Sequence, residues 1–84
     1  MAEPPSSPIS SLDVEKATLI KADQDIADGE RRITEQIDRI EELRADGRDT
    51  ARSEELLATF KDTLAEWYAH REQILRRIND LRNR

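Results

Sequence analysis

The acidic residues and the single histidine are the side chains of this sequence whose types and spacing could support chemistry. Adjacent carboxylates such as Glu41 and Glu42 could serve as a general acid and a general base. Consecutive residues of a helix do not face each other, however, so such a pair is not placed to act together. Metal sites in helical bundles use a Glu-x-x-His motif, whereas Glu66 and His70 stand four positions apart. The sequence therefore predicts a non-enzymatic protein without a cofactor or a metal site.

A basic C-terminal stretch is the second candidate for chemistry, because clustered arginines bind the phosphates of nucleic acids. Residues 69–84 carry five arginines against two acids, and the candidates are Arg76, Arg77, Arg82 and Arg84. The whole chain nevertheless has a formal net charge of −5, with its largest excess of acid in the first 30 residues. Charge pairing within the chain explains this asymmetry without a partner. A small regulator that binds nucleic acid through these arginines therefore stays the alternative function.

The composition indicates long helices in a protein of the cytoplasm. Of the 84 residues, 39% are charged and only two are glycine, a balance typical of helical and coiled-coil chains. The lack of cysteine excludes disulfides, zinc–thiolate sites and thiol catalysis. No apolar run approaches the roughly 20 residues that span a bilayer, and the N-terminus does not resemble a secretory signal. We therefore expect a cytoplasmic protein that does not contact membranes.

The chain divides into a short tail and one helical domain. Residues 1–9 contain all three prolines, and we expect a disordered tail because they cannot bury enough apolar surface to offset the entropy of ordering. Residues 10–84 are expected to form two helices, at about 11–46 and about 50–83, joined by a connector at about 47–49. Ser10 can cap the first helix, and Gly47 is the natural left-handed residue beyond its end. Asp49 or Thr50 can cap the second helix.

Apolar residues at coiled-coil spacing predict a seam between the two helices. In the first helix they recur every seven positions from Leu12 to Ile40, and in the second helix spacings of three and four alternate with one interruption, Arg71. Two helices joined by so short a connector must run antiparallel, which predicts an all-α, coiled-coil-like αα-hairpin. The predicted seam consists of Leu19, Ile26, Ile33, Ile37, Ile40, Leu57, Phe60, Leu64, Trp67, Arg71, Ile74, Ile78 and Leu81.

Folding the chain at residues 47–49 also predicts which residues face each other. Trp67 falls beside Gly29, and the missing side chain of that glycine makes room for the indole ring, with a hinge at Gly29 as the alternative. Arg71 is expected to pack its aliphatic stem in the seam and to direct its guanidinium toward Glu30 or solvent. One charged residue in a seam is typical of a device that fixes register.

The small size of the hairpin indicates assembly. A chain with one two-helix seam is expected to be marginally stable, and small natural scaffolds often add oligomerisation. Apolar residues that flank the seam, namely Ile20, Leu56, Tyr68 and Leu75, could supply a second face. We therefore expect a homodimeric four-helix bundle or contact with a partner helix, and an extended two-helix monomer is the alternative.

The segment Leu43–Leu64 contains the connector motif Asp-Gly-Arg-Asp-Thr, and Gly29–Ile33 and the pair His70-Arg71 stand on either side of it. Over residues 22–78 the chain resembles a group of small uncharacterised helical-hairpin proteins of alphaproteobacteria that share a D-G-x-D-T connector. Their function is unassigned, so the resemblance implies a fold and no biochemical activity. We therefore expect a non-enzymatic hairpin that acts through protein–protein contacts.

Overall fold

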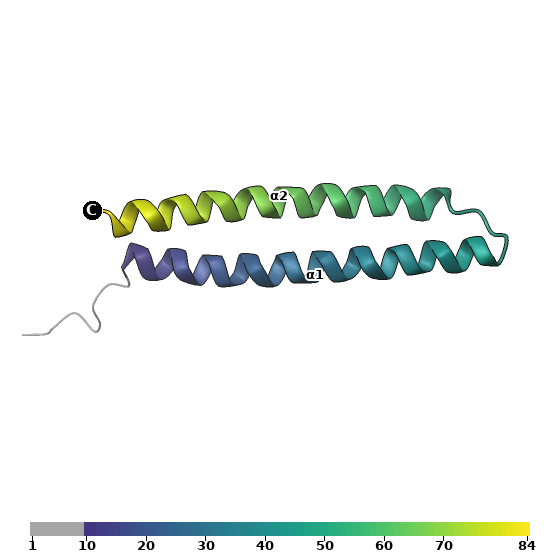
Figure 1. Cartoon of the computed structure of the whole chain (residues 1–84), viewed down its shortest axis with the longest axis horizontal. Helices are drawn as coiled ribbons and strands as arrows, with labels where there is room; N and C mark the ends of the chain where they lie inside the picture. Colours follow the sequence, from purple (N-terminus) through teal and green to yellow (C-terminus); the bar gives the residue numbers. More distant parts are fainter. Residues whose placement is uncertain (1–9) are drawn as a thin grey trace, which may run out of the picture.

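Two long antiparallel helices lie side by side in the computed structural model, which describes residues 10–84 (Figure 1). Helix α1 spans Ser11–Ala45 and helix α2 spans Ala51–Arg82. The prediction of an all-α antiparallel hairpin is confirmed. The disordered tail expected at residues 1–9 lies outside the described residues. Within residues 10–84, neither helix contains an apolar stretch long enough to cross a membrane.

The helix ends are fixed by local hydrogen bonds that the sequence provides. The Ser10 hydroxyl oxygen accepts a hydrogen bond from the backbone N–H of Asp13 (3.1 Å), which caps α1. At the other end of α1, the N–H of Gly47 donates to the carbonyl of Arg44, and the N–H of Arg48 donates to the carbonyl of Leu43. This pair of bonds is the Schellman arrangement, in which the residue after the C-cap adopts a left-handed conformation.

The second helix begins at Ala51, one residue later than the expected start at about residue 50. The Asp49 carboxylate accepts a hydrogen bond from the N–H of Ala51 (3.0 Å), whereas Thr50 makes no side-chain capping bond. Of the two candidates for this cap, Asp49 therefore supplies the side chain. The connector occupies residues 46–50, one residue longer at each side than the expected 47–49.

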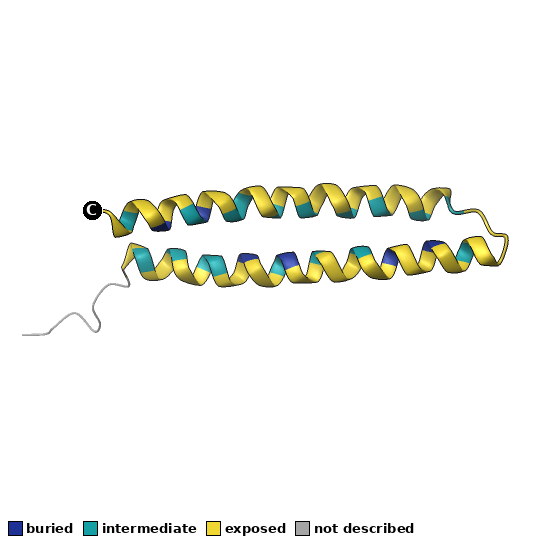
Figure 2. Ribbon diagram, viewed as in Figure 1, coloured by how far each residue is buried: buried dark blue, intermediate teal, exposed yellow. Residues whose placement is uncertain are grey.

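The core is a single seam between the helices (Figure 2). Its best-packed part lies near the open end of the hairpin, where Ala22, Ile74 and Ile78 form a buried cluster against which Leu12 and Leu19 pack. Ile74 is wholly buried, and Ala22 is only 1% exposed. Ile26 and Ile40 are the other buried apolar residues of the described chain. So thin a core is consistent with a hairpin that gains stability from a further contact.

A second seven-residue series completes the seam of α1. It runs three positions after the leucine and isoleucine series and consists of Glu15, Ala22, Gly29, Gln36 and Leu43, all of them buried or half-buried. This series corrects one expected seam residue. Ile37 is 39% exposed, and its neighbour Gln36 is buried instead. The Gln36 side-chain amide donates a hydrogen bond to the backbone carbonyl of Ser53 (2.8 Å), which satisfies the buried amide N–H.

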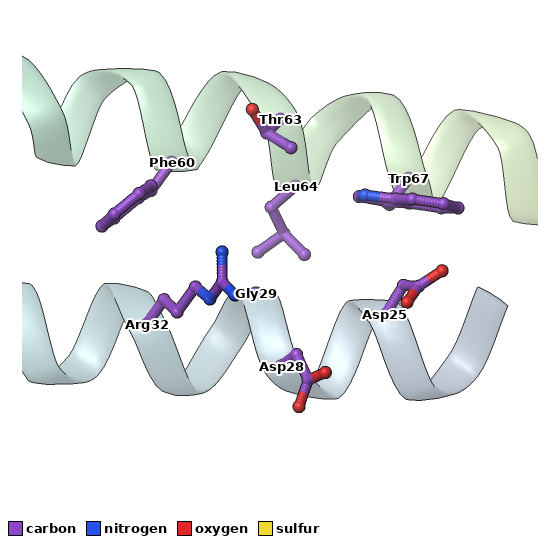
Figure 3. A pocket seen from close by; sticks show the side chains of 8 residues that line it. All are labelled: Asp25, Asp28, Gly29, Arg32, Phe60, Thr63, Leu64 and Trp67. Carbon is purple, nitrogen blue, oxygen red and sulfur yellow. The ribbon is translucent and has the colours of Figure 1, made fainter. Parts of the chain in front are cut away.

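Gly29 faces Leu64, and not Trp67 as the expected register predicts. A Cβ atom built on Gly29 would lie 3.2 Å from Leu64 Cδ1. Trp67 lies one turn further along α2, near Asp25 (Figure 3). The physical reason is one of size, because the small residues of α1 lie opposite branched aliphatic side chains of α2. Gly29 meets Leu64 in this way, just as Ala22 packs with Ile74.

We expect alanine substitutions at the two glycines to change stability in opposite directions. Gly47 has φ 70°, which an L side chain adopts at a cost, so Gly47→Ala lowers the free energy of unfolding by about 1 kcal/mol. Gly29 has helical geometry, and the tip of Leu64 can rotate into the hollow beside it. Gly29→Ala therefore gains most of the helix propensity of alanine, about 0.5 kcal/mol. Urea midpoints at one protein concentration check both values, and equal signs would contradict the two backbone assignments.

Candidate interaction surface

Twelve of the thirteen residues predicted for the seam lie buried or half-buried, and Ile37 is the exception. The buried members are Ile26, Ile40, Ile74 and Ile78. The half-buried members are Leu19, Ile33, Leu57, Phe60, Leu64, Trp67, Arg71 and Leu81. These side chains are used in holding the hairpin together. A surface for a partner must therefore be sought on the two sides of the seam.

A shallow hollow opens on one side of the seam, over Gly29 (Figure 3). It is lined by Asp25, Asp28, Gly29, Arg32, Phe60, Thr63, Leu64 and Trp67. Its two carboxylates are paired with cations of their own helix, Asp25 with Lys21 (2.6 Å) and Asp28 with Arg31 (3.3 Å). Within residues 10–84 no three acidic or histidine side chains gather to hold a metal ion. The hollow therefore presents packing space beside a glycine and no reactive group.

Three contacts between the helices define the opposite side of the seam. Arg44 pairs with Glu54 (3.1 Å), the Tyr68 hydroxyl donates to Glu30, and Arg71 donates to Asp23 (2.6 Å). Because Asp23, Glu30 and Arg44 are separated by multiples of seven positions, they lie along one line of α1. The Arg71 contact corrects the expectation that its guanidinium reaches Glu30, while the side chain stays 35% exposed to solvent. Glu30 is instead the acceptor of Tyr68.

This same side carries most of the exposed apolar side chains of the described chain. Ile37 occupies the line of Glu30, and Ile20 lies three positions before Asp23, on the adjoining turn. Ile20 is 61% exposed, Ile37 39% and Tyr68 46%. We call this surface the apolar flank; it consists of Ile20, Ala27 and Ile37 from α1 and of Ala58, Ala65, Tyr68 and Leu75 from α2.

The other two exposed large apolar residues do not belong to the apolar flank. Val14 lies beside Arg77 and Arg84 near the open end of the hairpin, and Leu56 lies beside Arg39 and Arg52 near the connector. The grouping of Leu56 with Ile20, Tyr68 and Leu75 as one second face, which the sequence suggested, is therefore wrong. Each of these two side chains therefore lies apart from the apolar flank.

The phenol of Tyr68 is held by a carboxylate, which sets its titration. The hydrogen bond to Glu30, together with burial and the negative charge of that carboxylate, raises the pKa of Tyr68 above its ordinary value. The neutral phenol is the favoured form, so the stability that this bond gives is present below pH 10 and is lost as the pH rises through the raised pKa. We expect phenolate absorbance at 295 nm to appear at higher pH than in free tyrosine. Glu30→Gln should lower that midpoint, and an unchanged midpoint would contradict the bond.

The C-terminal arginines are partly engaged by α1. Arg77 donates to Glu15 at 2.7 Å, whereas folding the chain at residues 47–49 would place Arg82 opposite Glu15. The same seam geometry that sets Gly29 against Leu64 brings Arg77, and not Arg82, level with Glu15. Arg76, Arg82 and Arg84 are exposed.

Comparisons of this chain with protein families, with curated proteins and with solved structures gave no match. The class of protein is therefore defined by the fold and by its surface. It is a helical hairpin in which three of the five exposed large apolar residues of the described chain lie on one side of the seam.

Proposed function

We propose that this protein is a non-enzymatic helical hairpin of the cytoplasm that acts by protein–protein contact along the apolar flank. The observation that carries the proposal is the placement of Ile20, Ile37 and Tyr68 on one side of the hairpin, each more than a third exposed. Apolar side chains that gather on one side of a helical surface are typical of a groove or face that receives another helix.

The thin core supports the same proposal. Five apolar residues are buried in the whole described chain, and a domain of this size buries a smaller fraction of its surface than a larger one. Burial of a large apolar side chain gives about 1.5–3 kcal/mol. Covering the apolar flank would therefore add a large share to the stability of the hairpin.

The nucleic-acid alternative has weaker support. Arg77, one of its four arginines, is engaged by Glu15, and the chain as a whole is acidic with a net charge of −5. Phosphate binding depends on a cluster of free cations. Protein contact is therefore the function that the geometry favours.

A photo-crosslinking residue placed on each side of the hairpin tests the proposal. We expect benzoylphenylalanine at Ile37 to give discrete covalent adducts in cells that make the protein. The same residue at Leu56 is the matched control, because Leu56 is 45% exposed, apolar and on the other side. Equal adducts from both positions, or none from Ile37, would contradict a contact along the apolar flank.

A further inference from the structure

We infer that the apolar flank is covered by a second copy of this chain, laid antiparallel to the first, so that two hairpins form a four-helix bundle. This inference rests on the proposed function, because it names the partner of the same surface. Its support is the order of side chains along α1, which repeats in reverse with complementary chemistry.

The flank side of α1 is symmetric about a point next to Gly29. Ile20 and Ile37 lie at equal distances from that point, about 13 Å on either side at 1.5 Å per residue. A two-fold axis through this point places Ile20 of each copy opposite Ile37 of the other copy, so the same contact forms twice. An isologous dimer requires this property, since one patch must be complementary to itself.

The charged residues beyond the isoleucines follow the same symmetry with opposite sign. Lys16 and Glu41 share the midpoint of Ile20 and Ile37, and so do Asp13 and Arg44. All four of these side chains are exposed. The two-fold axis that joins the isoleucines therefore also places Lys16 opposite Glu41 of the second copy and Asp13 opposite Arg44. Complementary charges of this kind favour the antiparallel orientation of the two copies.

Helix α2 contributes small side chains where the axis crosses it. Since Gly29 faces Leu64, the axis that relates Ile20 to Ile37 crosses α2 near Leu64, beside the exposed Ala65 of the apolar flank. A small side chain at this point permits close approach of the second copy.

The acids near the centre of the interface already have partners within the hairpin. Asp23 accepts from Arg71, and Glu30 accepts from the Tyr68 hydroxyl. A second copy laid over this region would therefore cover carboxylates that are hydrogen-bonded, which lowers the cost of removing water from them.

A parallel pairing of the two hairpins fits the flank less well. In that arrangement α1 of one copy lies over α2 of the other, and residues level with each other in one hairpin meet across the interface. The close contact of Gly29 with Leu64 fixes these levels. At these levels Ile37 lies over the stretch between Glu54 and Ala58, and Lys16 lies over the stretch between Leu75 and Asn79. A parallel pairing therefore brings together neither the two isoleucines nor the opposite charges of α1.

The size of the flank is sufficient for a stable dimer. From Asp13 to Arg44 the strip is about 47 Å long at 1.5 Å per residue, and it is two helices wide, about 18 Å. These dimensions give an area of roughly 800 Å² per partner, the usual size of a specific interface.

Disulfide trapping tests the orientation, because the chain has no cysteine of its own. Ile20→Cys and Ile37→Cys are made in separate full-length chains of different mass, mixed and equilibrated in a glutathione buffer. We expect the mixed disulfide to exceed either homodisulfide at least tenfold. Leu56→Cys mixed with Ile20→Cys is the control and should give no enriched product. Homodisulfides in equal or greater yield would overturn the antiparallel arrangement.

A charge reversal and its rescue test the same register without cysteine. Lys16→Glu places two acids opposite each other at both ends of the interface, and we expect the dimer dissociation constant to rise about tenfold. Adding Glu41→Lys restores opposite charges and should return the constant to that of the parent chain, measured by sedimentation over a range of concentrations. Failure of the second change to rescue would overturn the pairing of Lys16 with Glu41.

Failure of this inference is distinguishable from failure of the proposed function. A mass of 9.7 kDa at every concentration, together with adducts from Ile37 to another protein, would overturn the second copy as partner and keep the apolar flank as a contact surface. The same mass with no adduct from Ile37 would overturn both.

Discussion

Replacing Ile74 with alanine is expected to lower the free energy of unfolding by about 3 kcal/mol. Ile74 is wholly buried and lies in the cluster of Ala22 and Ile78, against which Leu12 and Leu19 pack. Truncation removes the transfer free energy of three carbons and leaves a cavity that two rigid helices cannot close. Because a chain of this length has only a few kcal/mol of stability, we expect the variant to be largely unfolded at 37 °C.

Leu56→Ala is the matched control for Ile74→Ala. Leu56 belongs to the same helix, has the same number of carbons and is 45% exposed on the side away from the apolar flank. We expect a loss below about 0.5 kcal/mol, because little apolar surface returns to water. Urea unfolding of both variants, followed by circular dichroism at 222 nm at one protein concentration, gives the comparison. Equal losses would contradict a core centred on Ile74.

The sequence predicts the hairpin because each local signal agrees with the next. The Ser10 cap, the left-handed Gly47 and the seven-residue apolar spacing all place two antiparallel helices over the observed residues. The cap and the left-handed glycine act on their own backbone, so they can be predicted from the local sequence alone. The apolar spacing marks the face of each helix that is buried, and it predicts the hairpin because a short connector leaves each helix only the other to pack against.

The same spacing did not predict the second series of α1, because three of its five members are not apolar and a fourth is the small Ala22. Glu15, Gly29 and Gln36 occupy seam positions that a search for large apolar residues passes over. The sequence prediction chose the apolar Ile37 as the seam residue, whereas the buried residue is its neighbour Gln36. The buried amide is tolerated because Ser53 offers a carbonyl at 2.8 Å, and only the structure shows that partner.

Placement of the flanking apolar residues also required the structure. The sequence shows that Leu56 and Tyr68 lie off the seam, but it does not show on which sides. Their separation follows from the contacts of Tyr68 with Glu30 and from the position of Leu56 beside Arg39. Once the two sides are distinguished, the reversed order of charges along the apolar flank becomes visible, and it had no meaning before.

Removal of the arginine that holds Glu15 is expected to destabilise the hairpin by about 2 kcal/mol. The Glu15 side chain is 17% exposed, and its Oε1 atom accepts from Arg77 Nε at 2.7 Å. Its Oε2 atom is shielded from solvent and has no hydrogen-bond partner among the described residues. Arg77→Leu therefore leaves a carboxylate that is largely out of water and has lost its one cation. Breaking a shielded pair from one side is costly for this reason.

Removal of the carboxylate itself is expected to have the opposite effect. Glu15 stands in the seam series of Ala22 and Gly29, where an aliphatic side chain packs without the desolvation cost, so Glu15→Leu gains about 1 kcal/mol. Arg77 is 47% exposed and returns to water when its partner is lost. The double variant Glu15→Leu/Arg77→Leu should then be as stable as Glu15→Leu alone, because the loss in Arg77→Leu arises only from the stranded carboxylate. A loss that persists in the double variant would assign the effect to packing of the arginine stem instead.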